Sequence, residues 1–174
     1  MKWYSVDNKF MDYLRSHESR IPRIDYGNNK FKPFFGQLFS IGDLIYVTPV
    51  SSPKTRHHGI KETLDFIKLY DGKRLIAVVN LRFMFPAYES DLTLVEYKTI
   101  DNFRSFDNEI QKNAYIALMK KEMKEIQKKA VDKQARRLYK LKYDYPHNEV
   151  SLRCFDFKDL EQKCVDYVKQ KSPS

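Results

Sequence analysis

The segment TLDFIKLYDGKRLIAVVNLRFMFP, residues Thr63–Pro86, decides the fold class. Asp71 and Gly72 stand between two runs that are rich in β-branched and aromatic residues. An Asp-Gly pair in this setting is typical of a short hairpin turn, because both residues tolerate positive φ. The segment therefore predicts a β-hairpin, which makes an antiparallel sheet the starting point for the fold.

Towards the N-terminus, three segments extend this pattern. PFFGQLFSIGDLIYVTPV, residues 33–50, predicts another hairpin, because Ser40, Gly42 and Asp43 separate two apolar runs. WYSVDNKFMDYLRSH, residues 3–17, predicts a strand followed by a short helix. RIPRIDYGNNK, residues 20–30, contains Pro and Gly and predicts a loop. The first half of the chain is thus expected to be mostly strands.

The second half has a helical pattern. SDLTLVEYKTI, residues 90–100, is a last extended piece, and residues 103–142 contain neither Gly nor Pro. Two displaced apolar stripes predict a helix with a break at Lys128–Asp132, and the helix is expected to end at Pro146. Asp156 then fits the N-cap of a C-terminal helix. The predicted apolar face of that helix contains Phe157, Leu160, Cys164 and Val168.

Length and composition are consistent with one domain spanning residues 1–174, because 42% of the 174 residues are hydrophobic. The net charge of +9 favours anionic partners, with nucleic acid and membrane surfaces first. No stretch approaches the roughly 18 apolar residues that span a bilayer. Charged residues also interrupt MKWYSVDNKF before a signal-peptide core could form, so we expect a cytoplasmic protein. Cys154 and Cys164 are then expected to be reduced thiols.

Positive charge is concentrated between Lys112 and Lys142. Eleven lysines and arginines face three acidic residues there, a net of +8. A stripe of this kind can simply keep a surface helix solvated. Like charges one turn apart repel by about 0.2–0.5 kcal/mol, however, so the excess of one sign favours contact with a phosphate backbone. The predicted phosphate-contacting residues are Lys112, Lys120, Lys121, Lys124, Lys128, Lys129, Lys133, Arg136 and Arg137, together with Arg56 further upstream.

Single-stranded RNA fits this segment better than two other partners. The apolar stripe is rich in Ala and Met and lacks the exposed Trp and Phe of membrane-surface helices. A helix that reads the DNA major groove would carry Arg or Asn near its start, whereas lysine dominates here. Tyr139, Tyr143 and Tyr145, expected to be exposed beside the basic helix, are candidates for base stacking.

The stretch VTPVSSPKTRHHGIK, residues 47–61, ends an apolar strand on hydroxyls, cations and imidazoles. RNA cleavage by its own 2′-hydroxyl needs a proton acceptor, a proton donor for the leaving 5′ oxygen, and cations around the phosphorus. These residue types fit that chemistry, although a polar turn with Pro53 at its corner is the alternative. On an extended chain His57 and His58 would point to opposite faces, so we expect neither a metal nor another cofactor.

The same stretch carries a family resemblance. VTPVSSPKTRH resembles the strand-then-[ST]-S-P-K-x-x-H segment of the ToxN/AbiQ family of endoribonuclease toxins, from type III toxin–antitoxin and phage-abortive systems. KWYSVDNKFMDYLR, KPFFG at residues 32–36 and VVNLRFMFP at residues 78–86 resemble other parts of the family in the same order. A basic helical half follows, as in the family.

The resemblance implies a fold and an activity. The fold would be Kid/MazF-like, with a twisted, SH3-like, partly closed antiparallel sheet, long basic helices and a C-terminal helix. The activity would be metal-independent cleavage of RNA, leaving 2′,3′-cyclic phosphate and 5′-hydroxyl ends. The partner would be an RNA antitoxin of pseudoknot repeats, which closes with the toxin into a cyclic assembly.

The resemblance also implies roles for individual residues. Lys54 and Ser52 would be the central catalytic pair, with Ser51 as an adjacent hydroxyl, Lys32 as a supporting cation and His57 at a nearby family position. Lys54 could stabilise the developing charge or protonate the leaving oxygen, and the residues do not identify the base.

One departure from the family concerns its first helix, where a tyrosine is often found. Phe10 stands at that position here, so a phenolic contribution would have to come from Tyr13 or Tyr4.

Two function classes stay open from the sequence. One is a toxin that cleaves RNA in phage defence by abortive infection. The other is a non-catalytic RNA-binding module that uses the same basic surface.

Overall fold

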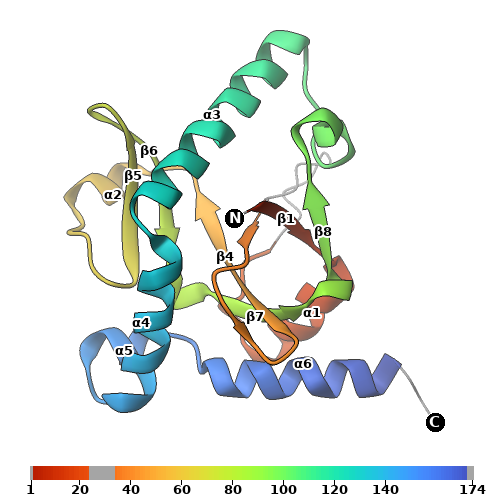
Figure 1. Cartoon of the computed structure of the whole chain (residues 1–174), viewed down its shortest axis with the longest axis vertical. Coiled ribbons are helices and arrows are strands. Elements are labelled where there is room, and N and C mark those ends of the chain that lie inside the picture. Colours follow the sequence, from red (N-terminus) through yellow and green to blue (C-terminus); the bar gives the residue numbers. More distant parts are fainter. Residues whose placement is uncertain (1, 24–33, 172–174) are drawn as a thin grey trace.

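The computed structural model describes residues 2–23 and 34–171 and has an α+β fold (Figure 1). The strands are β1 (Lys2–Val6), β2 (Phe34–Gly36), β3 (Ser40–Ile41), β4 (Leu44–Ser51), β5 (Phe66–Asp71), β6 (Arg74–Asn80), β7 (Phe85–Tyr88) and β8 (Leu92–Val95). The α-helices are α1 (Asn8–His17), α2 (Thr55–Gly59), α3 (Glu109–Lys128), α4 (Val131–Asp144), α5 (Glu149–Arg153) and α6 (Phe157–Lys171). Short 3₁₀ turns are η1 (Leu81–Phe83), η2 (Glu89–Asp91) and η3 (Tyr97–Asn102).

Both predicted hairpins are confirmed. β3 pairs with β4 across Gly42 and Asp43, and β5 pairs with β6 across a turn in which Gly72 has a φ of +60°. That left-handed conformation costs glycine little, which explains the residue at this turn. The predicted strand and helix at the N-terminus are β1 and α1. The predicted loop at residues 20–30 lies mostly outside the described residues.

The sheet is antiparallel, with the strand order β5-β6-β4-β2-β1-β8. β4 is shared between partners along its length: its first half pairs with β3 and β7, and its last residues pair with β2 and β6. β4 is therefore an inner strand of the sheet, and Ser51 is its last residue.

The basic segment is broken as predicted. α3 ends at Lys128 and α4 begins at Val131, with Ala130 between them at φ 47° and ψ 52°. The side chains that face the core on both sides of the break are Met119, Ile126, Val131, Ala135 and Leu138. The expectation of helix from residue 103 is wrong for residues 103–108. The side chain of Asn108 caps α3 by accepting from the Gln111 N–H at 2.9 Å, so the helix begins only there.

The C-terminal helix α6 is capped as predicted, because Asp156 Oδ1 accepts from the Asp159 N–H at 3.2 Å. Tyr167 is buried on its inner face, whereas Val168, predicted there, is 38% exposed. The short helix α5 was not predicted. Both cysteines are buried and free.

The strands and helices share one hydrophobic core. Figure 1 shows α6 running across the end of the molecule where β7 and α1 lie. The rings of Phe10 in α1 and Tyr167 in α6 are 5.2 Å apart, and the Cys164 thiol contacts the Pro86 carbonyl of β7 at 3.3 Å. Within the described ranges, no helix is long and apolar enough to cross a membrane.

Candidate active site

The serine–lysine loop, Ser52–Lys54, leaves the end of β4 and leads directly into α2. Ser51 is still paired with Val78 of β6, so the loop starts from a fixed strand. Ser52 and Lys54 are exposed, and Pro53 between them is partly buried. A hydroxyl and an ammonium are thus presented to solvent within three residues.

Hydrogen bonds hold α2 at both ends. The Lys54 N–H donates to Nδ1 of His57 at 3.0 Å, and the His57 N–H donates to the Lys54 carbonyl at 2.8 Å. At the other end, the buried ammonium of Lys68 in β5 donates to the His58 carbonyl at 3.0 Å. A cation at a helix C-terminus is favourable, because it offsets the partial negative charge there. The backbone of Lys54 is therefore fixed while its side chain stays in solvent.

His57 lies inside this arrangement rather than on an extended chain, so the expectation of extended backbone at His57 and His58 is wrong. Its ring is buried and packs edge-on against Phe66, with 5.7 Å between centroids. Burial, and then the charges of Arg56 and Lys54, lower its pKa. A neutral ring that accepts at Nδ1 carries its proton on Nε2. The contact between His57 and Lys54 is therefore one in which the imidazole accepts and the Lys54 backbone donates.

A cationic pocket of about 380 Å³ lies next to α2. Arg56, Lys61 and Arg82 line it, and the described residues include no carboxylate ion-paired with any of the three. Arg153 also lines the pocket, but it forms a two-pronged ion pair with Asp65 at 2.6 and 2.7 Å. The chemistry of this pocket suits an anion such as a phosphate.

Two polar atoms near the pocket lack partners among the described residues. The buried Oδ1 of Asn80 and Nε of Arg82 make no hydrogen bond there. The guanidinium of Arg82 lies 4.7 Å from the centre of the Phe83 ring. The sequence did not lead us to predict Arg82 as a site residue. The available signal was an arginine inside the apolar run VVNLRFMFP.

The family resemblance also draws attention to Lys32, Phe10, Tyr13 and Tyr4. Lys32 lies outside the described residues. Phe10 is fully buried, and Tyr13 packs on Tyr167 at 4.8 Å and on His17 at 4.8 Å. Tyr4 lies against Gly36, where an added Cβ would come within 2.6 Å of its ring. Burial raises the pKa of both tyrosines.

The predicted phosphate-contacting residues on α3 and α4 fall into two groups. Ion pairs hold Lys112 to Asp101, Lys121 to Asp71, Lys128 to Glu125 and Lys129 to Glu62. The exposed members for which the described residues provide no carboxylate partner are Lys120, Lys124, Lys133, Arg136 and Arg137. Arg136 lies over the Phe39 ring at 5.3 Å.

Two of the tyrosines proposed for stacking are not exposed. Tyr139 donates to Glu161 at 2.9 Å, and Tyr143 bonds Asp156 at 3.1 Å and accepts from the Lys158 N–H at 2.7 Å. Burial is the main cause of a raised pKa in both. That expectation is wrong for them because α6 packs against α4. Tyr145 is 65% exposed, as predicted.

Comparison with known sequences agrees with this picture. A sequence model described as "Toxin ToxN, type III toxin-antitoxin system" matches residues 2–165. A protein named "Endoribonuclease ToxN" from Pectobacterium atrosepticum is 29% identical over 109 residues, which are 59% of this chain and 63% of that protein. A second protein of that name, from Bacillus thuringiensis subsp. kurstaki, is 26% identical over 175 aligned positions, 95% of this chain and 84% of that protein. The match to the first relative thus spans less than two thirds of its length.

Solved structures share the fold. One, from work on "selective toxin inhibition by a non-coding RNA pseudoknot", has a TM-score of 0.78 at 21% identity, covering 97% of this chain and 98% of its own. Another, of "AbiQ, a lactococcal anti-phage endoribonuclease", has a TM-score of 0.75 at 19% identity, with the same coverage. At these identities the likeness establishes the fold alone.

Proposed function

The chain belongs to the ToxN family of toxins from type III toxin–antitoxin systems, and on that premise we propose that it is a metal-independent endoribonuclease. It cleaves single-stranded RNA by attack of the 2′-hydroxyl and leaves 2′,3′-cyclic phosphate and 5′-hydroxyl ends. It acts in the cytoplasm, is inhibited by a cognate RNA antitoxin of pseudoknot repeats, and serves phage defence by abortive infection. The observation that carries the proposal is the exposed Lys54 on a backbone that His57 holds in place.

The reaction needs few groups. The 2′ oxygen forms a bond to phosphorus as the bond from phosphorus to the 5′ oxygen breaks, and negative charge builds on the phosphoryl oxygens. The Lys54 ammonium stabilises that charge or gives its proton to the leaving oxygen. Ser52 and Ser51 orient the phosphate or the 2′-hydroxyl by hydrogen bonding, with Lys32 as a supporting cation. Water can take the 2′ proton, since Ser52 and Lys54 are exposed.

The pocket beside α2 supports this function. Arg56 and Lys61 follow the loop in the sequence and line this pocket together with Arg82. In the proposed complex, a phosphate next to the one that is cleaved binds in this pocket. Arginine binds phosphate through paired N–H donors, so a pocket with two arginines can fix the strand's direction. The exposed cations of α3 and α4 extend this surface to a longer RNA, including the antitoxin in a cyclic assembly.

The finer fold assignment is part of the same proposal. A Kid/MazF-like, SH3-like and partly closed sheet is supported by the way β4 changes partners, from β3 and β7 at one end to β2 and β6 at the other. Residues 1–174 would form one toxin domain, which the core shared by strands and helices supports.

The test is incubation of purified protein with a defined single-stranded RNA in EDTA, followed by chemical mapping of the product ends. Wild type is expected to give cyclic-phosphate ends, and Lys54→Ala to lower the rate by about 10²–10⁴-fold, the range for general acid catalysis. Ser52→Ala is expected to reduce the rate as well. Lys73→Ala, at the exposed β5–β6 turn, is the matched control and should cut like wild type. RNA that stays intact with wild type in every substrate, but binds all four proteins equally, would leave a non-catalytic binding module.

A further inference from the structure

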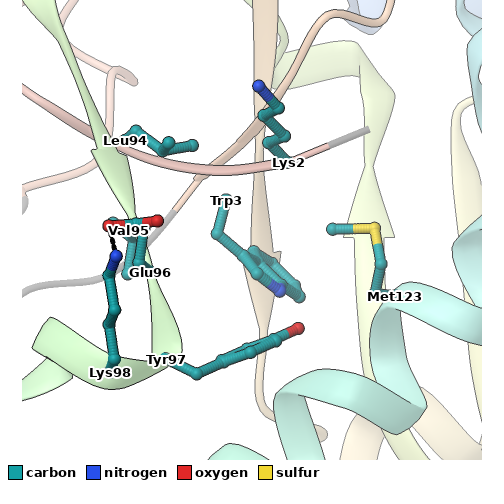
Figure 2. Close-up of a pocket in the computed structure, with 8 residues that line it drawn as sticks. All are labelled: Lys2, Trp3, Leu94, Val95, Glu96, Tyr97, Lys98 and Met123. Atoms are coloured by element: carbon teal, nitrogen blue, oxygen red, sulfur yellow. Dashed lines mark ion pairs between the residues drawn. The ribbon is translucent and has the colours of Figure 1, made fainter.

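A second pocket lies between α3 and the strands β1 and β8 (Figure 2). Its volume is about 430 Å³, within the range of about 300–1,000 Å³ that is common for small-ligand sites. We propose that this pocket binds one unpaired nucleobase of single-stranded RNA. The inference rests on the RNA-binding part of the proposed function and assigns a separate site to it.

Two aromatic side chains, Trp3 and Tyr97, line the pocket. Figure 2 shows the ring of Tyr97 edge-on below the indole of Trp3, with Met123 of α3 beside them. Tyr97 is partly exposed, so part of this side chain is open to a ligand. Stacking on an aromatic side chain is the usual way in which proteins hold the bases of single strands.

An unsatisfied donor belongs to the same pocket. Trp3 is only 3% exposed, and its Nε1–H has no hydrogen-bond partner among the described residues. Buried indole N–H groups usually find an acceptor, because leaving one unpaired costs about 1–3 kcal/mol. Figure 2 shows the indole nitrogen on the side of the ring towards Tyr97 and Met123. Met123 is unbranched and flexible, so it can move aside and let a base carbonyl or ring nitrogen reach that donor.

The rim of the pocket is cationic, which favours a nucleotide over an apolar ligand. Lys2 and Lys98 line the pocket and are exposed, and the Lys120 ammonium lies 5.3 Å from the centre of the Tyr97 ring. Lys98 pairs with Glu96 at 3.3 Å, at a site open to water where the pair is weak. Ammonium groups around an apolar floor suit a base with a phosphate on either side.

The strand register separates this pocket from the serine–lysine loop. Trp3 pairs with Phe35 of β2, and Phe35 pairs with Thr48 of β4, three residues before Ser51. With strand spacings of about 4.8 Å and a rise of about 3.3 Å per residue, Trp3 lies roughly 14 Å from Ser51. A base held here therefore belongs to a nucleotide outside the bond that is cut.

The experiment uses Trp3 as its own reporter, because it is the single tryptophan of the chain. Binding of a single-stranded 12-nucleotide RNA is measured with the Lys54→Ala protein, in which cleavage is expected to be slow. Fluorescence anisotropy of the labelled RNA gives Kd, and Trp3 emission reports on the pocket. Emission is expected to change with the same Kd. An abasic 12-mer, which has the phosphates but no bases, is expected to bind without that change.

Variants at Tyr97 test the stacking. Tyr97→Ala, introduced into the Lys54→Ala protein, is expected to weaken RNA binding by about 5- to 150-fold, the range for one stacked base. It is also expected to abolish the emission change. Adding Tyr97→Phe keeps the ring and should bind within about twofold. RNA that binds Tyr97→Ala as tightly as the parent, or leaves Trp3 emission unchanged, would overturn the pocket assignment and leave the cleavage proposal intact. Failure of wild type to cut RNA, with the emission change present, would overturn cleavage alone.

Discussion

Glu122 provides the most quantitative test of the packing of α3. Its side chain is buried, with 9% exposed, although it lies in the middle of the basic helix. Desolvation by burial raises its pKa from 4.5 to about 7. Replacing the carboxylate with the neutral amide in Glu122→Gln should remove the cost of burying a charge.

The size and sign of the effect follow from linkage. A difference of about 2.5 pKa units, at 1.36 kcal/mol per unit, corresponds to about 3 kcal/mol. Because the folded-state pKa is the higher one, the protonated folded state is fully favoured below about pH 4.5. The contribution of protonated Glu122 to the free energy of unfolding is lost as the pH rises through about 7. Glu122→Gln should therefore be about as stable as wild type at pH 4.5 and more stable by about 3 kcal/mol at pH 8.

Urea unfolding of both proteins at several pH values measures this difference. Titration of other groups cancels, since it is shared by wild type and variant. Glu109→Gln is the matched control, because Glu109 lies on the same helix with 78% of its side chain exposed. It should not produce a gain of about 3 kcal/mol at pH 8. A difference between wild type and Glu122→Gln that stays constant from pH 4.5 to 8 would refute the argument.

Two further predictions concern the basic helices. Ala130→Gly should raise the free energy of unfolding, measured in urea, by about 0.5–1 kcal/mol. The reason is that Ala130 has a φ of 47°, a conformation that glycine adopts without a Cβ clash. A loss of stability would contradict this prediction. Lys124→Ala should reduce the slope of log K against log salt for single-stranded RNA by about 0.7, one phosphate contact. Lys121→Ala, the control, should change the slope by less than half of that, because Lys121 is already paired with Asp71. Equal slopes for the two variants would show that the ion pair does not determine which lysine meets phosphate.

The features that the sequence predicted best are those with local causes. Asp71 and Gly72 specify a turn within their own few residues, and the change of apolar stripe near Ala130 is visible from helical periodicity. The start of α3 was placed too early, because the absence of Gly and Pro permits a helix but does not begin one. Asn108 with Gln111 three residues later was the available signal, since that spacing matches a helix cap.

Long-range contacts explain what the sequence did not reveal about the site. Residues 52–58 suggested catalytic groups by type, but α2 is too short for its periodicity to be recognised. The burial of His57 depends on Phe66, and the anchoring of α2 depends on Lys68, both from β5. In the same way, Tyr139 and Tyr143 are occupied by Glu161 and Asp156, which only the packing of α6 brings near.

Long-range contacts also reduce the number of cations on α3 and α4 that are available to bind phosphate. The sequence count of +8 treats every lysine as available, yet four of them pair with carboxylates. Three of those carboxylates, Glu62, Asp71 and Asp101, come from outside the segment, which lowers the net charge of this surface from +8 to +5. These pairs fasten the helices to neighbouring segments, so the remaining exposed cations define the surface on which a phosphate backbone can lie. Lys120, over Tyr97, places that surface beside the proposed base pocket.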